Sequence, residues 1–251
     1  MKISIIIPVF NEEKTISRVL KKILNLKMIW KKEVIVVNDG STDNTLKIIK
    51  KFKPHRIISY SQNRGKGYAL SQGIKNCNGD YVLIQDADLE YDPEDIPDLL
   101  KAAGYNTAVY GNRFSFPQTD MPFLYRFGNK FLTALTNLLY RTGLNDMETG
   151  YKLIPVDFAK KMDIQSSRFD IEPEITAKLI KGGYSIKEIP ISYHGRTRLA
   201  GKKLTVTDAF GALKTLISNR FPNFDMFLLL FILTAVFIVY SIIDWIVYFS
   251  I

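Results

Sequence analysis

Three acidic residues, Asp86, Asp88 and Glu90, alternate directly after the apolar run Tyr81–Ile84. Alternate residues of an extended segment point to the same side, so we expect the three carboxylates to crowd one another. At about 4 Å and an effective dielectric near 20, each close pair costs roughly 4 kcal/mol. Carboxylate oxygens suit Mg²⁺ or Mn²⁺, which would relieve this repulsion and leave coordination sites open for a pyrophosphate. The pattern therefore predicts a metal site, with an acidic solvated loop as the alternative.

Basic residues in other motifs indicate phosphate as a ligand. Lys66 lies in NRGKGYALSQG, where the N–H groups of a helix start and nearby cations suit a phosphate. Arginine binds phosphate through two parallel hydrogen bonds, and the motifs YGNRF and SYHGRTRLAGKKL supply Arg113, Arg196, Arg198, Lys202 and Lys203. A solvated or lipid-facing basic stretch is the alternative for the later cluster.

Asp39 is a further candidate for ligand binding, because it ends an apolar run in VIVVNDGSTDNT. The glycine that follows allows a tight turn, and we expect Ser41 or Thr42 to cap the next helix. An ordinary helix start with turn-forming Asn and Asp is an equally good interpretation.

The first 112 residues alternate between strands and helices. We interpret as strands the apolar runs KISIIIPVF, EVIVVND, RIISY, DYVLIQD and TAVYGNR. Asn11 is expected to cap the first helix, with Glu12 and Glu13 in its first turn. Single helices between strands predict an α/β fold with a mainly parallel sheet, in which ligands bind beyond the carboxyl ends of the strands. All of the polar motifs fall at this edge.

Composition narrows the possible partners of the chain. The net charge of +9 suggests an anionic partner, either a membrane surface, a phosphorylated substrate or nucleic acid. The aromatic stacking pattern of RNA-binding modules is missing, so we discount nucleic acid. One cysteine, Cys77, rules out an internal disulfide and points to a reducing compartment, and two distant histidines make a zinc site a poor fit.

The C-terminal segment is strongly apolar. Residues 226–243 hold no charge, and 18 residues of helix span about 27 Å, close to the thickness of a bilayer core. We therefore expect a transmembrane helix over 224–249, with a buried core helix as the alternative. Lys and Arg occur only on the N-terminal side of this segment, so a single-pass protein would keep residues 1–220 in the cytoplasm, at the cell membrane or an endomembrane.

Two segments of the second half mix aromatic, apolar and basic residues in a way that suits helices on a membrane surface. They cover about 122–141 and 204–220, and an amphipathic core helix is the competing interpretation for each. No Gly/Ser/Pro-rich linker divides residues 1–220, so we expect one catalytic domain followed by an anchor.

Residues 1–216 carry a set of motifs: IIIPVFNEE, VVNDGSTDNT, NRGKGYALSQG, GDYVLIQDADLEYDP, YGNRF, DMETGYKL and FDIEPEITAKLIKGGYSIKEIPISYHGRTRLAGKKL. Together they resemble family 2 glycosyltransferases, and more narrowly the dolichol-phosphate mannose synthase and polyprenyl-phosphate glycosyltransferase branch. The resemblance implies a GT-A fold, a nucleotide-sugar donor and a membrane-embedded isoprenoid phosphate as acceptor.

The same resemblance implies roles for individual residues. The nucleoside pocket would be lined by Pro8, Asn11, Glu12 and Asp39. Mg²⁺ or Mn²⁺ would be held against the donor diphosphate by Asp86, Asp88 and Glu90, where related mannose synthases usually have Gln at the third position. The acceptor phosphate would contact Arg113 and Arg126, and a loop carrying Arg196 and Arg198 would close over the diphosphate.

The implied reaction is an inverting transfer of a hexose, from a donor such as GDP-mannose or UDP-glucose, to dolichyl or polyprenyl phosphate. A phosphate monoester is mostly ionised near neutrality and needs no strong base. A polysaccharide or protein hydroxyl as acceptor would need one, for which Asp146 and Glu172 are candidates. A non-catalytic nucleotide-sugar-binding membrane scaffold is the remaining alternative. For Glu172 and Glu174 in FDIEPE, a structural role is favoured over assistance in catalysis.

Overall fold

The computed structural model describes residues 1–116, 121–166, 170–195 and 206–223. Its strands are β1 (Lys2–Val9), β2 (Lys31–Asp39), β3 (Arg56–Tyr60), β4 (Tyr81–Ile84), β5 (Thr107–Asn112), β6 (Lys152–Pro155) and β7 (Ser185–Pro190). Its α-helices are α1 (Ile16–Asn25), α2 (Thr45–Phe52), α3 (Lys66–Lys75), α4 (Ile96–Ala102), α5 (Phe123–Tyr140), α6 (Val156–Lys161), α7 (Ile171–Lys181) and α8 (Val206–Arg220), and two 3-10 helices are η1 (Pro93–Asp95) and η2 (Arg113–Ser115).

The strands form a single sheet in the order β3-β2-β1-β4-β6-β5-β7. Every neighbouring pair is parallel except those that involve β6, which runs antiparallel to both β4 and β5. The prediction of a mainly parallel α/β sheet is confirmed. Because β6 is reversed, its first residue, Lys152, lies at the end of the sheet where β4 and β5 finish, and the loop before it joins the polar edge.

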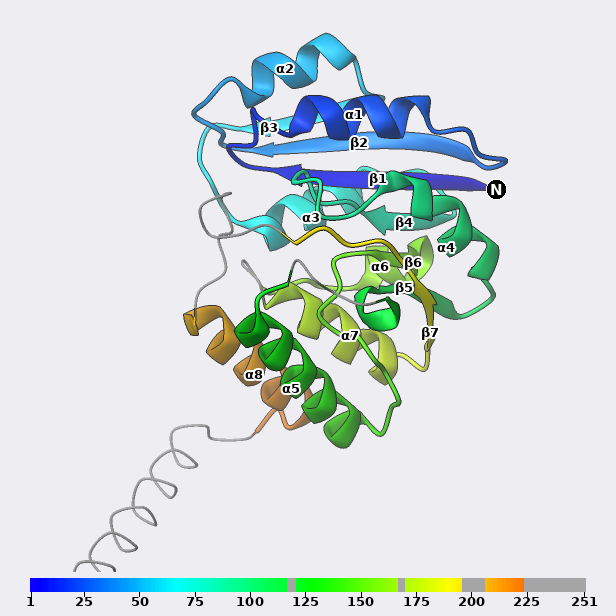
Figure 1. The fold of residues 1–251 in the computed structure, drawn as a ribbon, viewed down its shortest axis with the longest axis vertical. Helices are drawn as coiled ribbons and strands as arrows, with labels where there is room; N and C mark the ends of the chain where they lie inside the picture. Colours follow the sequence, from blue (N-terminus) through cyan, green and yellow to red (C-terminus); the bar gives the residue numbers. More distant parts are fainter. Residues whose placement is uncertain (117–120, 167–169, 196–205, 224–251) are drawn as a thin grey trace, which may run out of the picture.

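Helices cover both faces of the sheet, which explains why the central strands are apolar throughout (Figure 1). Ile3, Ile5 and Ile7 of β1 pack in a core with α1, α2 and α4. Ile6 faces the opposite side and packs in a second core with α3, α6 and α7. This alternation follows from the two-residue period of a strand.

A third apolar cluster lies away from the sheet, where α5, α7 and α8 pack together. It is formed by Leu132, Tyr140, Leu144, Met147, Ala177, Ala212 and Leu216. The two segments predicted as membrane-surface helices, 122–141 and 204–220, therefore coincide with α5 and α8, and one face of each is buried against the domain.

Two predicted helix starts are wrong. Asn11 does not cap α1, which begins at Ile16 after Thr15; Asn11 has a left-handed backbone (φ 52°), and its Oδ1 accepts a hydrogen bond from the Thr42 N–H at 2.8 Å. The residue preceding α2 is Asn44, neither Ser41 nor Thr42. The polar side chains after β1 and β2 bind each other across the two loops, and this tertiary pairing displaces the local caps.

No helix within the described ranges is long and apolar enough to cross a membrane. The segment 224–249, for which a spanning helix is predicted, lies outside these ranges, as do Arg196 and Arg198. The predicted division into 1–220 and 224–249 stays a prediction.

Two helical glycines give a matched test of how α3 packs on the sheet. A Cβ at Gly73 would lie 2.4 Å from Ile6 Cγ2, whereas a Cβ at Gly128 in α5 would meet nothing within 4 Å. Alanine favours helix over glycine by about 1 kcal/mol, but overpacking costs roughly 1–3 kcal/mol. We expect Gly128→Ala to raise the free energy of unfolding by up to about 1 kcal/mol and Gly73→Ala to lower it by about 1–2 kcal/mol. Denaturant unfolding measures both, and a Gly73→Ala variant as stable as Gly128→Ala would contradict the packing described here.

Candidate active site

The carboxyl ends of β1, β2 and β4 bring the polar motifs together, as the sequence predicts. Asp39 ends β2 and is 2% exposed. Its Oδ1 accepts the Arg64 N–H at 2.9 Å and its Oδ2 accepts the Gly65 N–H at 2.7 Å. Asp39 thus fixes the loop that leads into α3, where Gly65 adopts φ 96° and Lys66 opens the helix.

Lys66 lies between two carboxylates. Its Nζ is 2.9 Å from Asp86 Oδ1 and 2.8 Å from Glu172 Oε1, so α3, the turn after β4 and the first turn of α7 meet at one ammonium group. Burial by itself would lower the pKa of Lys66, but the charges of Asp86 and Glu172 raise this pKa well above its ordinary value. Lys66 therefore stays charged. It supplies a positive charge next to the acidic motif, where the sequence predicts a cation.

The acidic motif does not keep the extended form from which its geometry was predicted. β4 ends at Ile84, the chain turns, and Leu89 adopts a left-handed backbone with φ 66°. The Glu90 N–H donates to Asp88 Oδ1 at 3.1 Å, which closes a turn of the kind that Asp favours. Asp86 and Glu90 are consequently directed toward different partners.

Glu90 is 8% exposed and its Oε2 accepts a hydrogen bond from the Tyr193 hydroxyl at 2.7 Å. Within the described part of the chain, no group of three or more His, Cys, Asp or Glu side chains is arranged to hold a metal ion. The segment is therefore not extended as expected, and the assignment of Asp86, Asp88 and Glu90 as metal ligands stays a prediction. Asp86 and Asp88 are the part of the set that fits a cation bound jointly with a ligand's own oxygens.

Asp86 itself is placed for close approach. Its Oδ2 lies 2.6 Å from where a Cβ would stand on Gly150, so only glycine allows the loop before β6 to lie against this carboxylate. Tyr91 also holds this loop, because its hydroxyl oxygen accepts the Gly150 N–H at 2.6 Å.

A group of three tyrosines that was not predicted from the sequence supports the acidic turn. Tyr91 stacks on Tyr151 with ring centroids 4.8 Å apart, and it meets Tyr193 edge-on at 5.5 Å. The Tyr151 hydroxyl donates to Gln85 Oε1 at 2.5 Å. Each of these tyrosines adjoins a motif residue in LEYDP, TGYKL or ISYHG, which is the signal that could have indicated them.

Arg113 forms a buried ion pair with Asp146. Its Nε and Nη2 donate to the two carboxylate oxygens at 2.8 and 2.7 Å, and its backbone N–H adds a third hydrogen bond of 2.9 Å. Burial by itself would lower the pKa of Arg113. The charge of Asp146 and the neighbouring groups outweighs this effect, so the pKa of Arg113 lies well above its ordinary value. The geometry gives Arg113 a structural partner, and Arg126, the other residue expected at an acceptor phosphate, is exposed on α5.

Two further charged groups, Glu148 and Lys152, lie beside this pair and were not singled out from the sequence. Glu148 Oε1 is buried without a hydrogen-bond partner among the described residues. Burial and then the charge of Glu172 raise the pKa of Glu148 to about 8, although Lys152 and Arg113 act in the opposite direction. Burial lowers the pKa of Lys152 to about 7, and its Nζ donates to the Met147 carbonyl at 2.7 Å.

The remaining predicted residues surround this centre or lie apart from it. Pro8 is buried in β1, and the Glu12 N–H donates to Thr45 Oγ1 at 2.9 Å. The role of both residues in a nucleoside pocket stays a prediction. Glu174 has a structural role, as favoured: its oxygens accept the backbone N–H groups of Gln165 and Ser166, each at 2.8 Å. Glu172, by contrast, belongs to the centre through Lys66.

Comparisons with known proteins identify the family to which the chain belongs. Residues 4–162 match the family described as glycosyl transferase family 2. An uncharacterized protein of Methanocaldococcus jannaschii is 34% identical over 201 residues, which cover 76% of this chain and 80% of that protein. A low-salt glycan biosynthesis hexosyltransferase, Agl6, of Haloferax volcanii is 30% identical over 202 residues, or 77% of this chain and 48% of the relative.

A dolichol-phosphate mannosyltransferase of Pyrococcus furiosus is 28% identical over 218 residues, which are 81% of this chain and 61% of that protein. Among solved structures, glucosyl-3-phosphoglycerate synthase from Mycobacterium tuberculosis, in complex with Mn²⁺, UDP and phosphoglyceric acid, superposes with a TM-score of 0.69 at 20% identity. The match covers 88% of this chain and 78% of that one. This likeness shows the fold.

The raised pKa of Glu148 predicts how stability depends on pH. Because the folded protein holds this proton up to about pH 8, whereas an unfolded Glu loses it near 4.3, stability falls as pH rises through this window. Glu148→Gln removes the ionisation, so the variant should gain on the wild type as pH rises, by about 1–3 kcal/mol at the upper end.

Denaturant unfolding at several pH values between about 5 and 8 measures this gain. The groups that face Glu148 are Glu172 of α7, Lys152 of β6, Arg113 and Asp146. Glu94→Gln, at an exposed acid of η1, serves as the control and should show no such trend. A stability difference between Glu148→Gln and wild type that stays constant with pH would refute the assignment.

Proposed function

Because the chain belongs to glycosyl transferase family 2, we propose that this glycosyltransferase transfers a hexose from a nucleotide-sugar donor to the phosphate of an isoprenoid lipid. The donor is of the GDP-mannose or UDP-glucose type, and the reaction takes place at the cytoplasmic face of a membrane. The dolichol-phosphate mannosyltransferase among the relatives supports the acceptor class.

The observation that favours a phosphate acceptor is that the acidic side chains around the centre are either ion-paired or protonated. A hydroxyl acceptor needs a general base, and the predicted candidates were Asp146 and Glu172. Asp146 is fully buried and held by the guanidinium and backbone N–H of Arg113, and Glu172 pairs with Lys66. Glu148, with a pKa of about 8, holds a proton near neutrality. A phosphate monoester, whose second pKa is near 6, needs none of them as a base.

In this mechanism an oxygen of the lipid phosphate attacks the anomeric carbon of the donor sugar. The bond from that carbon to the nucleoside diphosphate breaks, and the diphosphate leaves with the electron pair from the opposite face, so the configuration inverts. The protein's main contribution is to place the two substrates and to stabilise charge on the leaving group.

Asp86 and Asp88 would hold Mg²⁺ or Mn²⁺, which supplies positive charge to the departing diphosphate when it is bound. Asp86 lies close to Gly150 and pairs with the ammonium group of Lys66. Both features fit a carboxylate whose charge is balanced by a cation. The related synthase from M. tuberculosis has been solved with Mn²⁺ or Mg²⁺ and UDP, which supports this cofactor class. Arg196 and Arg198 are proposed to contact the diphosphate, and Arg126 the acceptor phosphate.

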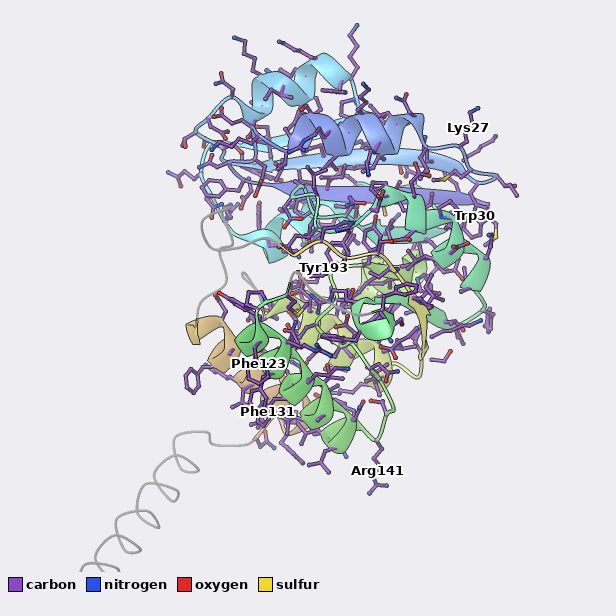
Figure 2. All side chains as sticks on the ribbon, viewed as in Figure 1. Lys27, Trp30, Phe123, Phe131, Arg141 and Tyr193 are labelled. Atoms are coloured by element: carbon purple, nitrogen blue, oxygen red, sulfur yellow. The ribbon has the colours of Figure 1, made fainter. Side chains whose placement is uncertain are left out.

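A row of exposed apolar side chains on α5 supports a lipid acceptor. Phe123, Phe127 and Phe131 recur every four residues, and Leu138 continues the row; their exposed fractions are 82, 60, 55 and 77%. Figure 2 marks Phe123 and Phe131 along α5. Exposed basic residues Arg126, Lys130 and Arg141 flank the row. Apolar side chains bordered by cations are the pattern of a helix on an anionic bilayer.

The activity is tested with the purified full-length protein, polyprenyl phosphate and, in turn, labelled GDP-mannose, UDP-glucose and UDP-N-acetylglucosamine. We expect one donor to give label that partitions into organic solvent. Asp88→Asn should lower this transfer about 100-fold or more, because charge stabilisation of the leaving group is lost. Glu94→Gln, which changes a nearby exposed acid, should keep wild-type activity.

Label found only in water-soluble polysaccharide or protein would favour a hydroxyl acceptor instead. Near-normal transfer by a folded Asp88→Asn variant would overturn the metal site. Circular dichroism of the variant establishes that it is folded.

The proposed membrane surface is tested with a fluorescent label at position 127. Cys77 is buried, so a cysteine introduced by Phe127→Cys can be labelled selectively with an environment-sensitive dye. On reconstitution into vesicles that contain anionic lipid, its emission should shift to the blue, because the row of phenylalanines enters the interface. Lys27→Cys, at an exposed position far from α5 (Figure 2), should show little shift. Equal shifts at both positions would count against this surface.

A further inference from the structure

We propose that Glu148, in the loop before β6, is a specificity-determining residue that binds a hydroxyl group of the donor sugar. The inference rests on the proposed transfer of a hexose from a nucleotide-sugar donor, and it names the part of the donor that this loop recognises. Three observations about the loop carry it.

The first observation is that the loop 145–150 is held in place along its length. Its backbone N–H groups donate to side chains from other parts of the chain: Asn145 and Asp146 to Glu188 at 2.8 Å, Met147 to Thr133 at 3.1 Å and Gly150 to Tyr91 at 2.6 Å. The Met147 carbonyl also accepts a hydrogen bond from the buried Lys152. The backbone is therefore fixed on both sides of Glu148.

The second observation is that the Glu148 carboxyl group is unpaired in this fixed loop. Among the buried side-chain nitrogen and oxygen atoms of the described ranges, only Glu148 Oε1 and Asn38 Oδ1 lack a hydrogen-bond partner. Asn38 keeps a hydrogen bond to Ser59 through its other side-chain atom. Buried polar groups are almost always hydrogen-bonded, because an unpaired one is costly. The Glu148 side chain is partly exposed, so a ligand can supply the missing partner.

The third observation is the position of the loop beside the acidic turn. Gly150 lies against Asp86, whose Oδ2 is 2.6 Å from where a Cβ would stand on this glycine. Glu148 is two residues before Gly150, and two residues of chain span at most about 7 Å. The charge of Glu172, which pairs with Lys66, also acts on Glu148. A sugar attached to a diphosphate at Asp86 would therefore lie within reach of Glu148.

The chemistry of the Glu148 carboxyl group suits a neutral ligand. The charged groups that face it are Glu172, Lys152, Arg113 and Asp146, and burial is the main reason that the pKa of Glu148 rises to about 8. A carboxyl group that keeps its proton donates one hydrogen bond and accepts others, as a sugar hydroxyl does. The hexose is the part of the donor that offers neutral hydroxyl groups, whereas the diphosphate is charged.

A buried partner of this kind discriminates between sugars. A donor that lacks the matching hydroxyl, or presents it in another direction, would leave the carboxyl group unpaired, and sites built to hydrogen-bond a substrate hydroxyl reject such analogues strongly. Because the loop is held by its neighbours, it cannot easily shift to recover the contact. Glu148 thus selects the sugar independently of the nucleotide.

The experiment measures donor binding to the purified full-length protein by calorimetry, with Mn²⁺ and without the lipid acceptor. The ligand pairs are GDP-mannose and GDP, UDP-glucose and UDP, and UDP-N-acetylglucosamine and UDP. The variants are Glu148→Ala and Glu148→Gln, and Glu94→Ala, at an exposed acid, is the matched control. Monodeoxy analogues of the sugar that binds are measured with the wild type and with Glu148→Ala.

We expect Glu148→Ala to weaken the sugar nucleotide about fivefold or more and the matching nucleoside diphosphate less than about twofold, because only the sugar loses a hydrogen bond. Glu148→Gln should stay within about threefold of the wild type, since an amide both donates and accepts. One deoxy analogue should bind the wild type about fivefold or more weakly than the full sugar, and it should bind Glu148→Ala no more weakly than the full sugar does.

Equal losses for the sugar nucleotide and the nucleoside diphosphate in Glu148→Ala would overturn the inference, because they would indicate a general disturbance of the site. So would deoxy analogues whose losses in the wild type and in Glu148→Ala are the same. If no sugar nucleotide binds the wild type, the proposed donor and this inference both fail. If the binding pattern holds and no lipid is labelled, the proposed acceptor fails and the inference stands.

Discussion

The site depends on one electrostatic constraint: a carboxyl group buried at the end of the sheet must be matched by a positive charge or a hydrogen-bond donor, or it keeps its proton, as Glu148 does. Lys66 meets this requirement for Asp86 and Glu172 together, and Arg113 meets it for Asp146. Removing one partner of a buried pair leaves an uncompensated charge, at a typical cost of about 3–5 kcal/mol. The ion pairs therefore hold α3, the turn after β4, η2 and α7 in one arrangement.

The topology explains how so many charged residues reach one place. Parallel strands deliver the residues after β1, β2 and β4 to a common edge, and the reversed strand β6 brings the loop that precedes it to the same edge. That loop supplies Asp146, Glu148 and Gly150, none of which follows a parallel strand. Burial disfavours the ionised forms of Glu148 in this loop and of Lys152 at the start of β6, as their opposite pKa shifts indicate.

The same arrangement separates two kinds of surface. The acids and Lys66 lie at the edge of the sheet, whereas α5 and α8 bury one face in their own cluster with α7 and leave the phenylalanine row of α5 exposed. The proposed reaction needs both a site for the donor diphosphate and a surface that meets the bilayer in which the lipid acceptor is held.

The sequence by itself determined the parallel sheet, the edge at which the polar motifs gather, the acidic and basic motifs and the family, because each depends on local period or on a short motif. It could not determine which charges pair. Lys66, for which a phosphate ligand is predicted, bridges Asp86 and Glu172 in the structure, and Glu172 lies 106 residues away in the sequence. Likewise Asn11 and Ser41 bind across loops instead of capping helices. Glu90 turns away from Asp86 because Leu89 reverses the backbone and Tyr193 offers a donor. Only the tertiary structure decided these partners, since the energy of an ion pair or a buried hydrogen bond depends on distances that long-range packing sets.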